Sequence, residues 1–195
     1  MAESGFSRAR LEAFSDGVIA VVITIMVLDL KAPADDRLAS LLELWPSFLC
    51  YAISFVYVAI YWINHHALLA PAKRVTPALM WSNNALLFFL SLFPFATAYM
   101  AATRISRFAT MIYGVLQLLC AAAFGLLHGV IVRQYKDDPT WRKEAEGAIW
   151  KGRASRTLYA LAVPAAYINP FISIAIFVIV AVVYTVPDLL ARRTS

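Results

Sequence analysis

Charged residues are scarce in this sequence. Asp, Glu, Lys and Arg make up 15% of its 195 residues, whereas about 25% is usual in soluble domains. Hydrophobic residues make up 62% of the chain, and the mean hydropathy is +0.70. This balance excludes an ordinary soluble domain and favours an integral membrane protein. The net charge of +5 does not indicate nucleic-acid binding, because the basic residues lie between apolar blocks rather than in one patch.

The motifs of soluble enzymes are also missing from the sequence. It has no glycine-rich phosphate loop, no cysteine pair at metal-binding spacing and no H-E-x-x-H. Cys50 and Cys120 both lie inside apolar blocks, which argues against a disulfide framework. His65 and His66 are adjacent, so on a helix they point about 100° apart and cannot chelate one ion together. We therefore expect no enzyme activity, no cofactor and no metal site built from protein ligands.

Long apolar blocks are what the sequence does contain. Six of them predict membrane-spanning helices in a single transmembrane domain of residues 1–195, at about 14–30, 44–63, 79–101, 109–132, 155–167 and 170–186. The residues before the first block mix acids with bases, so we expect that block to be retained rather than cleaved as a signal peptide. The basic stretch 133–156 fits either a short amphipathic helix at the membrane surface or a solvated loop.

The basic residues predict the orientation in the membrane. Six crossings place both termini on one side, and 13 of the 17 Lys and Arg residues flank that side, whereas the opposite side has Lys31, Arg37, Arg104 and Arg107. Cytoplasmic loops are enriched in Lys and Arg. The sequence therefore predicts an all-α membrane protein with both termini in the cytoplasm.

The first apolar block carries a stripe of mostly small residues. At about 100° per residue, Gly17, Val21, Thr24 and Leu28 share one narrow face of the helix, while bulkier residues cover the far side. Such a stripe fits close packing between helices, with Thr24 bonded to its own backbone. It also fits a pore wall, where Val21 and Leu28 narrow the passage and the hydroxyl meets water or ions.

Asp16 lies close to the start of the same block. A carboxylate in a membrane segment is costly and usually faces protein or water. Near a helix N-terminus it also meets the favourable end of the helix dipole. Ser15 and Asp16 could alternatively cap the spanning helix, with Arg10 on a preceding turn. The spacing alone leaves these possibilities open.

The same residues resemble a known family. Arg10, Phe14, Ser15 and Asp16 at the opening of the first of six helices resemble the R-x-x-x-F-S-D signature of the transmembrane-protein-175 type potassium channels. The resemblance continues through Thr24 and Leu28, the Y-W-I-N-H-H ending of the second block, and W-S-N-N-A-L-L in the third. It covers roughly the first half of the chain, and the remainder only through the number of helices.

The resemblance implies a pore and an assembly. Single-repeat members of this family form homotetramers in which the first helix of each subunit lines a central pore. By position, Val21, Thr24 and Leu28 would face that pore, with a permeant potassium ion near Thr24 and no other metal. Val21 is smaller than the expected constriction residue, which shifts the expected gate toward Leu28. By resemblance, we expect a prokaryotic plasma membrane.

The resemblance also gives the polar residues a structural role. Arg10, Phe14, Ser15 and Asp16 would join the cytoplasmic end of the first helix to Trp62, His65 and Asn84 on the next two helices. Such a network is sensible physically, because a carboxylate in a dry site needs donors, and these side chains supply N–H groups.

The expected activity is a potassium channel of weak to moderate selectivity. The sequence contains no T-V-G-Y-G filter, so selection must come from side chains and pore width. Two other activities remain as alternatives at this stage. They are a proton-coupled secondary transporter, which could use Asp16 and the histidines, and a non-conducting membrane scaffold.

Overall fold

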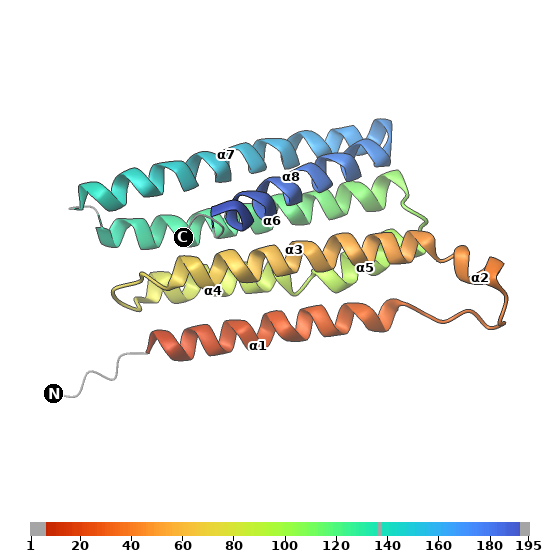
Figure 1. The fold of residues 1–195 in the computed structure, drawn as a ribbon, viewed down its shortest axis with the longest axis horizontal. Coiled ribbons are helices and arrows are strands. Elements are labelled where there is room, and N and C mark those ends of the chain that lie inside the picture. Colours follow the sequence, from red (N-terminus) through yellow and green to blue (C-terminus); the bar gives the residue numbers. More distant parts are fainter. Residues whose placement is uncertain (1–6, 136–137, 192–195) are drawn as a thin grey trace.

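The protein is a bundle of long, roughly parallel and antiparallel helices (Figure 1). This computed structural model describes residues 7–135 and 138–191, and in that part of the chain every regular element is helical. The helices are α1 (Arg8–Met26), α2 (Leu38–Leu42), α3 (Trp45–Leu69), α4 (Pro77–Leu90), α5 (Phe93–Ala102), α6 (Arg107–Val132), α7 (Pro139–Ile168) and α8 (Pro170–Ala191). Single 3₁₀ turns, η1 (Val27–Asp29) and η2 (Arg133–Tyr135), extend α1 and α6.

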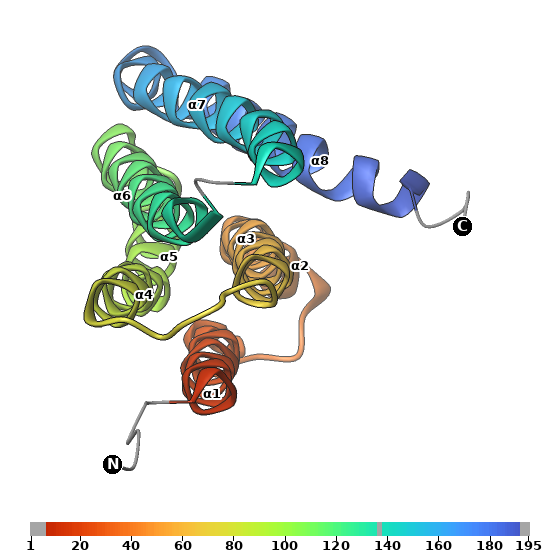
Figure 2. The ribbon, with the colours of Figure 1, turned by 90° about the vertical axis from the view of Figure 1, so that its left-hand side faces the viewer.

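Four stretches are long and apolar enough to cross a membrane. They are Arg8–Asp29, Trp45–Leu69, Pro77–Ala102 and Arg107–Tyr135, and Pro170–Thr185 forms a shorter apolar helix. The expectation of an all-helical protein is thereby confirmed for the described residues, and four helices, against the six expected, are long and apolar enough to span a membrane. Viewed end-on, α1 lies at one edge of the bundle and α7 and α8 lie at the opposite side (Figure 2).

The first helix begins earlier than the apolar block that predicted it. Ser7 is its N-cap, and its side-chain oxygen accepts a hydrogen bond from the Arg10 backbone N–H at 3.3 Å. Arg10 therefore lies within α1, and Ser15 and Asp16 lie two turns inside the helix, so the capping alternative for these two residues is wrong. Hydropathy alone placed the start too late, because the first turns of α1 are polar.

The predicted helix 79–101 is interrupted in the structure. α4 ends at Leu90 and α5 begins at Phe93, with Pro94 in the first turn of α5. Proline has no N–H to donate to the carbonyl of the residue four positions earlier, which is Leu90, and its ring crowds that carbonyl. α4 and α5 therefore form one crossing with a break near its middle.

α7 is longer than the apolar block 155–167. It runs from Pro139 to Ile168, so most of the stretch for which an amphipathic helix or a loop was expected is part of one long helix. α7 turns into α8 at Asn169, whose side-chain oxygen accepts from the Phe171 backbone N–H at 2.9 Å. Ser173 on α8 donates to the Ala162 carbonyl on α7 at 2.6 Å. The two helices thus form an antiparallel hairpin.

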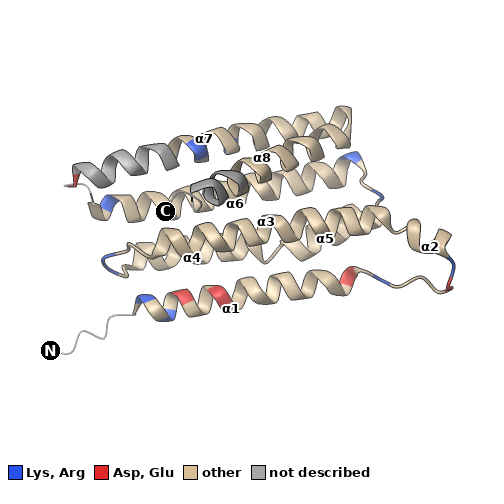
Figure 3. Ribbon diagram, in the orientation of Figure 1, with Lys and Arg blue, Asp and Glu red and all other residues tan. Residues whose placement is uncertain are grey.

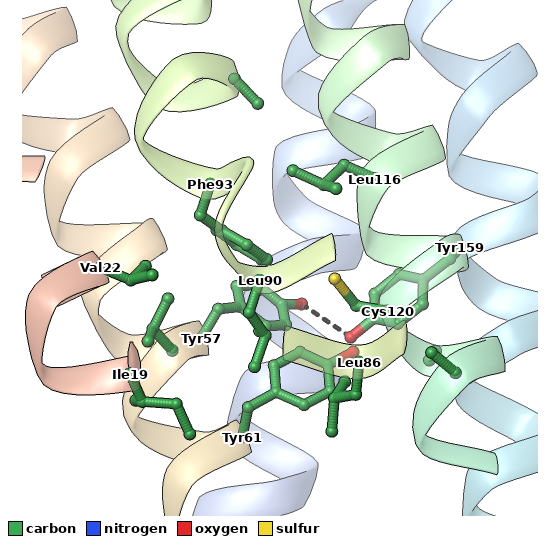
Figure 4. Close-up of a cluster of buried hydrophobic side chains, with 14 of the residues drawn as sticks. Ile19, Val22, Tyr57, Tyr61, Leu86, Leu90, Phe93, Leu116, Cys120 and Tyr159 are labelled. Carbon is green, nitrogen blue, oxygen red and sulfur yellow. Dashed lines mark hydrogen bonds between the residues drawn. The ribbon is translucent and has the colours of Figure 1, made fainter. Parts of the chain in front are cut away.

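The core is a continuous cluster of apolar and aromatic side chains from all the long helices (Figure 4). Tyr57 on α3 lies at its centre, where its hydroxyl donates to the Phe177 carbonyl on α8 at 2.6 Å and accepts from the Tyr159 hydroxyl at 3.3 Å. Thr97 donates to Ser54 at 2.7 Å in the same interior. Buried hydroxyl groups are thus paired across helices, as a low-dielectric interior requires.

Charged residues gather at the two ends of the bundle (Figure 3). We call the end where α1 starts and α3 and α6 finish the basic end. Its residues include Arg8 at the start of α1, Lys73 and Arg74 in the loop between α3 and α4, and Arg133 just after α6. Between the two ends the helices are nearly free of Lys and Arg in the part of the chain that the structure describes. This banding is the pattern of a protein that crosses a hydrocarbon layer.

Candidate functional site: the exposed face of α1

α1 has one buried face and one exposed face. The buried residues are Leu11, Ser15, Ile19, Val22 and Met26, which pack toward α3, α4 and α5. The residues of the predicted stripe are all exposed: Gly17, Val21 and Thr24 on α1, and Leu28 on η1, the turn that extends it. α1 itself lies at the edge of the bundle (Figure 2).

The exposed face differs from an ordinary lipid-facing surface in two ways. Val21 is 52% exposed and Leu28 is 67% exposed, but apolar exposure of this kind is expected on any face that meets lipid. Gly17 is the first distinguishing feature, because a Cβ added there would meet nothing within 4 Å. Thr24 is the second, since it places a hydroxyl midway along an otherwise apolar face.

The Thr24 hydroxyl is held by its own helix. It donates to the carbonyls of Ala20 and Val21, each at 3.0 Å. A hydroxyl has one hydrogen to donate and two lone pairs that accept. With the hydrogen directed back at the helix, the oxygen presents its lone pairs outward, which is the arrangement that suits a cation.

Asp16 is tied to α3. The Trp62 ring N–H donates to Asp16 Oδ1 at 2.9 Å. This hydrogen bond joins the basic ends of α1 and α3, and it brings together two of the residues that the sequence analysis placed in one network. Hydrogen bonds to charged groups are among the stronger ones in proteins.

A second, buried connection joins α1, α3 and α4. Asn83 on α4 donates from Nδ2 to Ser15 Oγ at 3.0 Å, and its Oδ1 lies 2.6 Å from His65 Nε2. Ser15 in turn donates to the Leu11 carbonyl at 2.8 Å. Asn83, Ser15 and His65 are all buried, whereas His66 is exposed. His65 is therefore the histidine that faces inward.

The asparagine of this connection differs from the one that the sequence analysis named. Asn84 is exposed on α4 and Asn83 occupies the buried position. Adjacent residues on a helix point about 100° apart, so only one of the two can face α1 and α3. Helical periodicity favours Asn83 for the buried position. Asn83 lies on the same face of α4 as Leu79, Leu86 and Leu90, which are all fully buried.

The remaining signature residues lie at the rim of α1. Phe14 is 57% exposed and lines a groove of ≈ 510 Å³ between α1 and the α4–α5 break, together with Gly17, Val21 and Pro94. Arg10 is exposed in the first turn of α1.

Arg8 makes two contacts that were not predicted from the sequence. Its guanidinium donates to the Ala70 carbonyl just after α3, and it forms an ion pair with Glu12 at 3.5 Å. The basic end of α1 is thereby fixed to α3 by a second link beside that of Asp16. No motif in the sequence distinguishes Arg8 from its neighbours.

Comparison with known proteins identifies the family. The sequence profile described as "Endosomal/lysosomal potassium channel TMEM175" matches residues 10–94, a range that contains the stripe, the Asp16–Trp62 bond and the Ser15–Asn83–His65 connection. A protein of Chryseobacterium sp. named as a potassium channel is 40% identical over 182 residues, which cover 93% of this chain and 94% of that protein. The chain is a member of the TMEM175 family.

The similarity to the TMEM175 family extends to the fold. The crystal structure of a "lysosomal potassium-selective channel TMEM175 homolog" from Chamaesiphon minutus matches with a TM-score of 0.80 and 31% identity, covering 92% of this chain and 97% of that one. The human protein named "Endosomal/lysosomal proton channel TMEM175" is 35% identical over 102 residues, 46% of this chain but 20% of its own length. The resemblance drawn from the sequence is thus confirmed, and this TMEM175 chain belongs to a family of ion channels rather than of enzymes.

Proposed function

We propose that this chain forms a potassium channel in which α1 of each copy in a homotetramer lines a central pore. The observation that carries the proposal is the exposed face of α1, which sits at the edge of the bundle and carries Gly17, Val21, Thr24 and Leu28. The Thr24 oxygen gives this face an acceptor that contact with lipid does not require. The names of the Chryseobacterium and Chamaesiphon relatives support potassium as the ion.

Thr24 would be the ion-contacting residue. Four copies around an axis supply four hydroxyl oxygens, each with its hydrogen turned back into α1. Potassium loses its hydration shell more readily than sodium, so a narrow and weakly polar ring favours potassium modestly. Side chains rather than backbone carbonyls would make the selection, so the selectivity is weak to moderate. The permeant ion is the only bound ion that the proposal requires.

Leu28 would form the gate. It is the larger of the two apolar residues on the pore face, and it is more exposed than Val21. A ring of four leucine side chains can close a pore by excluding water without filling the passage completely. Val21 is too small to close the passage as tightly.

The polar connections of α1 would hold the pore helix in register. The Asp16–Trp62 bond and the Ser15–Asn83–His65 connection fix α1 against α3 and α4. A one-residue rotation of α1 would break both, because it turns the side chains by about 100°. These residues are therefore assigned to positioning the pore wall and not to contacting the ion.

The orientation follows from the charges. Six crossings, with α7 and α8 as the last two, place both termini at the basic end, and we propose that this end faces the cytoplasm of a prokaryotic cell. Basic residues on cytoplasmic loops set this orientation in membrane proteins. The channel would then act in the cell membrane.

Potassium flux into liposomes that contain the purified protein tests the proposal. The wild type should pass potassium in preference to sodium, with caesium and protons measured alongside, and Leu28→Ala should increase the flux severalfold because it widens the gate. Leu126→Ala is the matched control, since Leu126 is 65% exposed on α6 while Leu28 is 67% exposed on η1, at the end of α1. The control should conduct like the wild type.

Other outcomes would favour the rival activities. Saturable potassium uptake that requires a proton gradient, without channel-like flux, would indicate a proton-coupled transporter. The absence of flux from folded wild type and Leu28→Ala protein would indicate a scaffold. An equal gain in Leu28→Ala and Leu126→Ala would contradict a pore lined by α1.

A further inference from the structure

A second cavity lies away from the proposed pore. It has a volume of ≈ 760 Å³ and is lined by residues of α3, α6, α7 and α8, whereas α1 lies at the other side of the bundle (Figure 2). Its walls are partly apolar and aromatic, with Ile60, Phe124, Tyr159 and Val180 among the lining residues. Cavities that bind small ligands typically measure about 300–1,000 Å³, so this one is large enough for a ligand.

The cavity is also strongly basic. Arg133, Lys151, Arg153 and Arg156 line it, together with His128. None of the described lining residues is an Asp or a Glu. Arg156 is half-buried, and within the described part of the chain no carboxylate forms an ion pair with it. A partly buried guanidinium is costly unless an opposite charge lies near it, and the described lining residues supply none, so a ligand that supplied an anion would be favoured here.

Gly125 on α6 makes room for the Arg156 side chain. A Cβ at position 125 would lie 2.6 Å from Arg156 Nη1 and 3.5 Å from its Cζ. The two helices thus hold the guanidinium against a bare stretch of backbone. Any larger side chain at position 125 would displace it, and the placement of Arg156 is therefore built into the packing of α6 against α7.

The depth of Arg156 matches the surface of a bilayer. Gly125, which Arg156 contacts, lies 18 residues after Arg107 at the opposite end of α6, or about 27 Å along the helix at about 1.5 Å per residue. The hydrocarbon core of a bilayer is about 30 Å thick. Arg156 therefore lies close to the boundary on the basic-end side, where the phosphates of lipid headgroups are found.

We propose that this cavity binds an anionic phospholipid, with the headgroup phosphate on Arg156 and an acyl chain along the apolar wall. Arg156 provides a planar fork that can bind two phosphate oxygens at once. Lys151, Arg153 and Arg133 surround it with further positive charge, as in other basic pockets between membrane helices that hold lipid headgroups. The apolar wall favours an amphiphile over free phosphate.

Thermal unfolding of the purified full chain in detergent tests this site without any measurement of conduction. Dioctanoyl-phosphatidylglycerol should raise the unfolding temperature, by about 5–10 °C at a hundredfold excess over its dissociation constant. Dioctanoyl-phosphatidylcholine, with the same acyl chains and no net charge, and inorganic phosphate should raise it much less. Arg156→Gln should shift the phosphatidylglycerol titration to concentrations about ten- to hundredfold higher.

Two further variants keep the test decisive. Arg107→Gln removes the same charge at the opposite end of α6 and should titrate like the wild type. If Arg156→Gln fails to fold, the double variant Lys151→Gln and Arg153→Gln, at exposed positions of α7, should still weaken the response. Equal stabilisation by inorganic phosphate would overturn the lipid assignment in favour of a soluble anion. An undiminished response in both Arg156→Gln and the double variant would overturn the site itself.

Discussion

The side chain of Asn83 joins three helices. It is fully buried on α4, donates to Ser15 on α1 and contacts His65 on α3. Asn83→Ala would leave His65 without this partner in a buried position, and a buried polar group without a partner costs about 1–3 kcal/mol. We expect a loss of stability of that size, measured as a lower unfolding temperature of the purified protein.

Asn84→Ala is the matched control for this prediction. Asn84 is exposed, and exposed substitutions usually change stability by less than about 0.5 kcal/mol. Equal losses in the two variants would contradict the assignment of Asn83.

The pair Asn83 and Asn84 also shows a limit of prediction from the sequence. The motif indicates that an asparagine serves the network, but choosing between neighbours requires the rotation of α4 about its axis, which packing decides.

The role of Thr24 can be tested by a substitution that hardly changes the shape of the side chain. Thr24→Val replaces the hydroxyl with a methyl group, so we expect the pore to keep its width and lose part of its preference for potassium over sodium. A hydrogen-bonding group contributes about 0.5–1.5 kcal/mol, roughly two- to tenfold in a ratio of permeabilities. Flux measurements in liposomes with the two ions would show this. Thr24→Ser keeps the oxygen and should keep the preference, and an unchanged ratio in Thr24→Val would exclude Thr24 as the selective residue.

At the scale of helices, Gly114 sets the distance between α6 and the α7–α8 hairpin. A Cβ at this position would lie 3.2 Å from Val163 Cγ2 and 3.4 Å from Phe177 Cζ. Gly114→Val would overfill this contact, and overpacking typically costs about 1–3 kcal/mol. We expect a corresponding fall in thermal stability. Gly129→Val on the same helix changes helix propensity equally but meets open space, so a similar fall there would contradict the packing argument.

The helices also show how far hydropathy predicts this fold. The apolar blocks located the starts of α3, α6 and α8 to within two residues, because these helices are apolar there, but they ended α3 at 63 instead of Leu69 and α8 at 186 instead of Ala191. The break between α4 and α5 lies inside a continuous apolar block, and only Pro94 hints at it. The first half of α7 is rich in charged residues and Gly, so no hydropathy threshold would have joined it to the apolar half.

For the whole molecule, the arrangement of copies gives the sharpest prediction. If four copies surround a pore lined by α1, the Leu28 side chains of neighbouring copies lie close to the axis. Leu28→Cys should then form disulfide-linked dimers under mild oxidation, detected by non-reducing electrophoresis. The native Cys50 and Cys120 are fully buried, so they should add little background.

Leu126→Cys provides the comparison for cross-linking. Leu126 has nearly the same exposure on α6, but in the proposed assembly it faces lipid or a different surface. The Leu126→Cys protein should therefore form no disulfide link and run as a single chain on the non-reducing gel. Cross-linking of Leu126→Cys alone would contradict the arrangement. The sequence could predict that Gly17, Val21 and Thr24 share one face of α1 because their spacing follows the helical period, but it did not predict that the bulky Phe14 and Ile25 are exposed as well. The number of copies rested on the family resemblance, since nothing in a single chain counts its partners.

The hydrogen bonds that Thr24 makes to its own helix bear on how the protein is made. A newly synthesised copy meets lipid before it meets its partners, and an unsatisfied hydroxyl donor in hydrocarbon carries a substantial free-energy penalty. Ala20 and Val21 already accept that hydrogen. We therefore expect that a lone subunit can leave the insertion machinery and diffuse in the bilayer, with the surface proposed to contact ions tolerated by lipid.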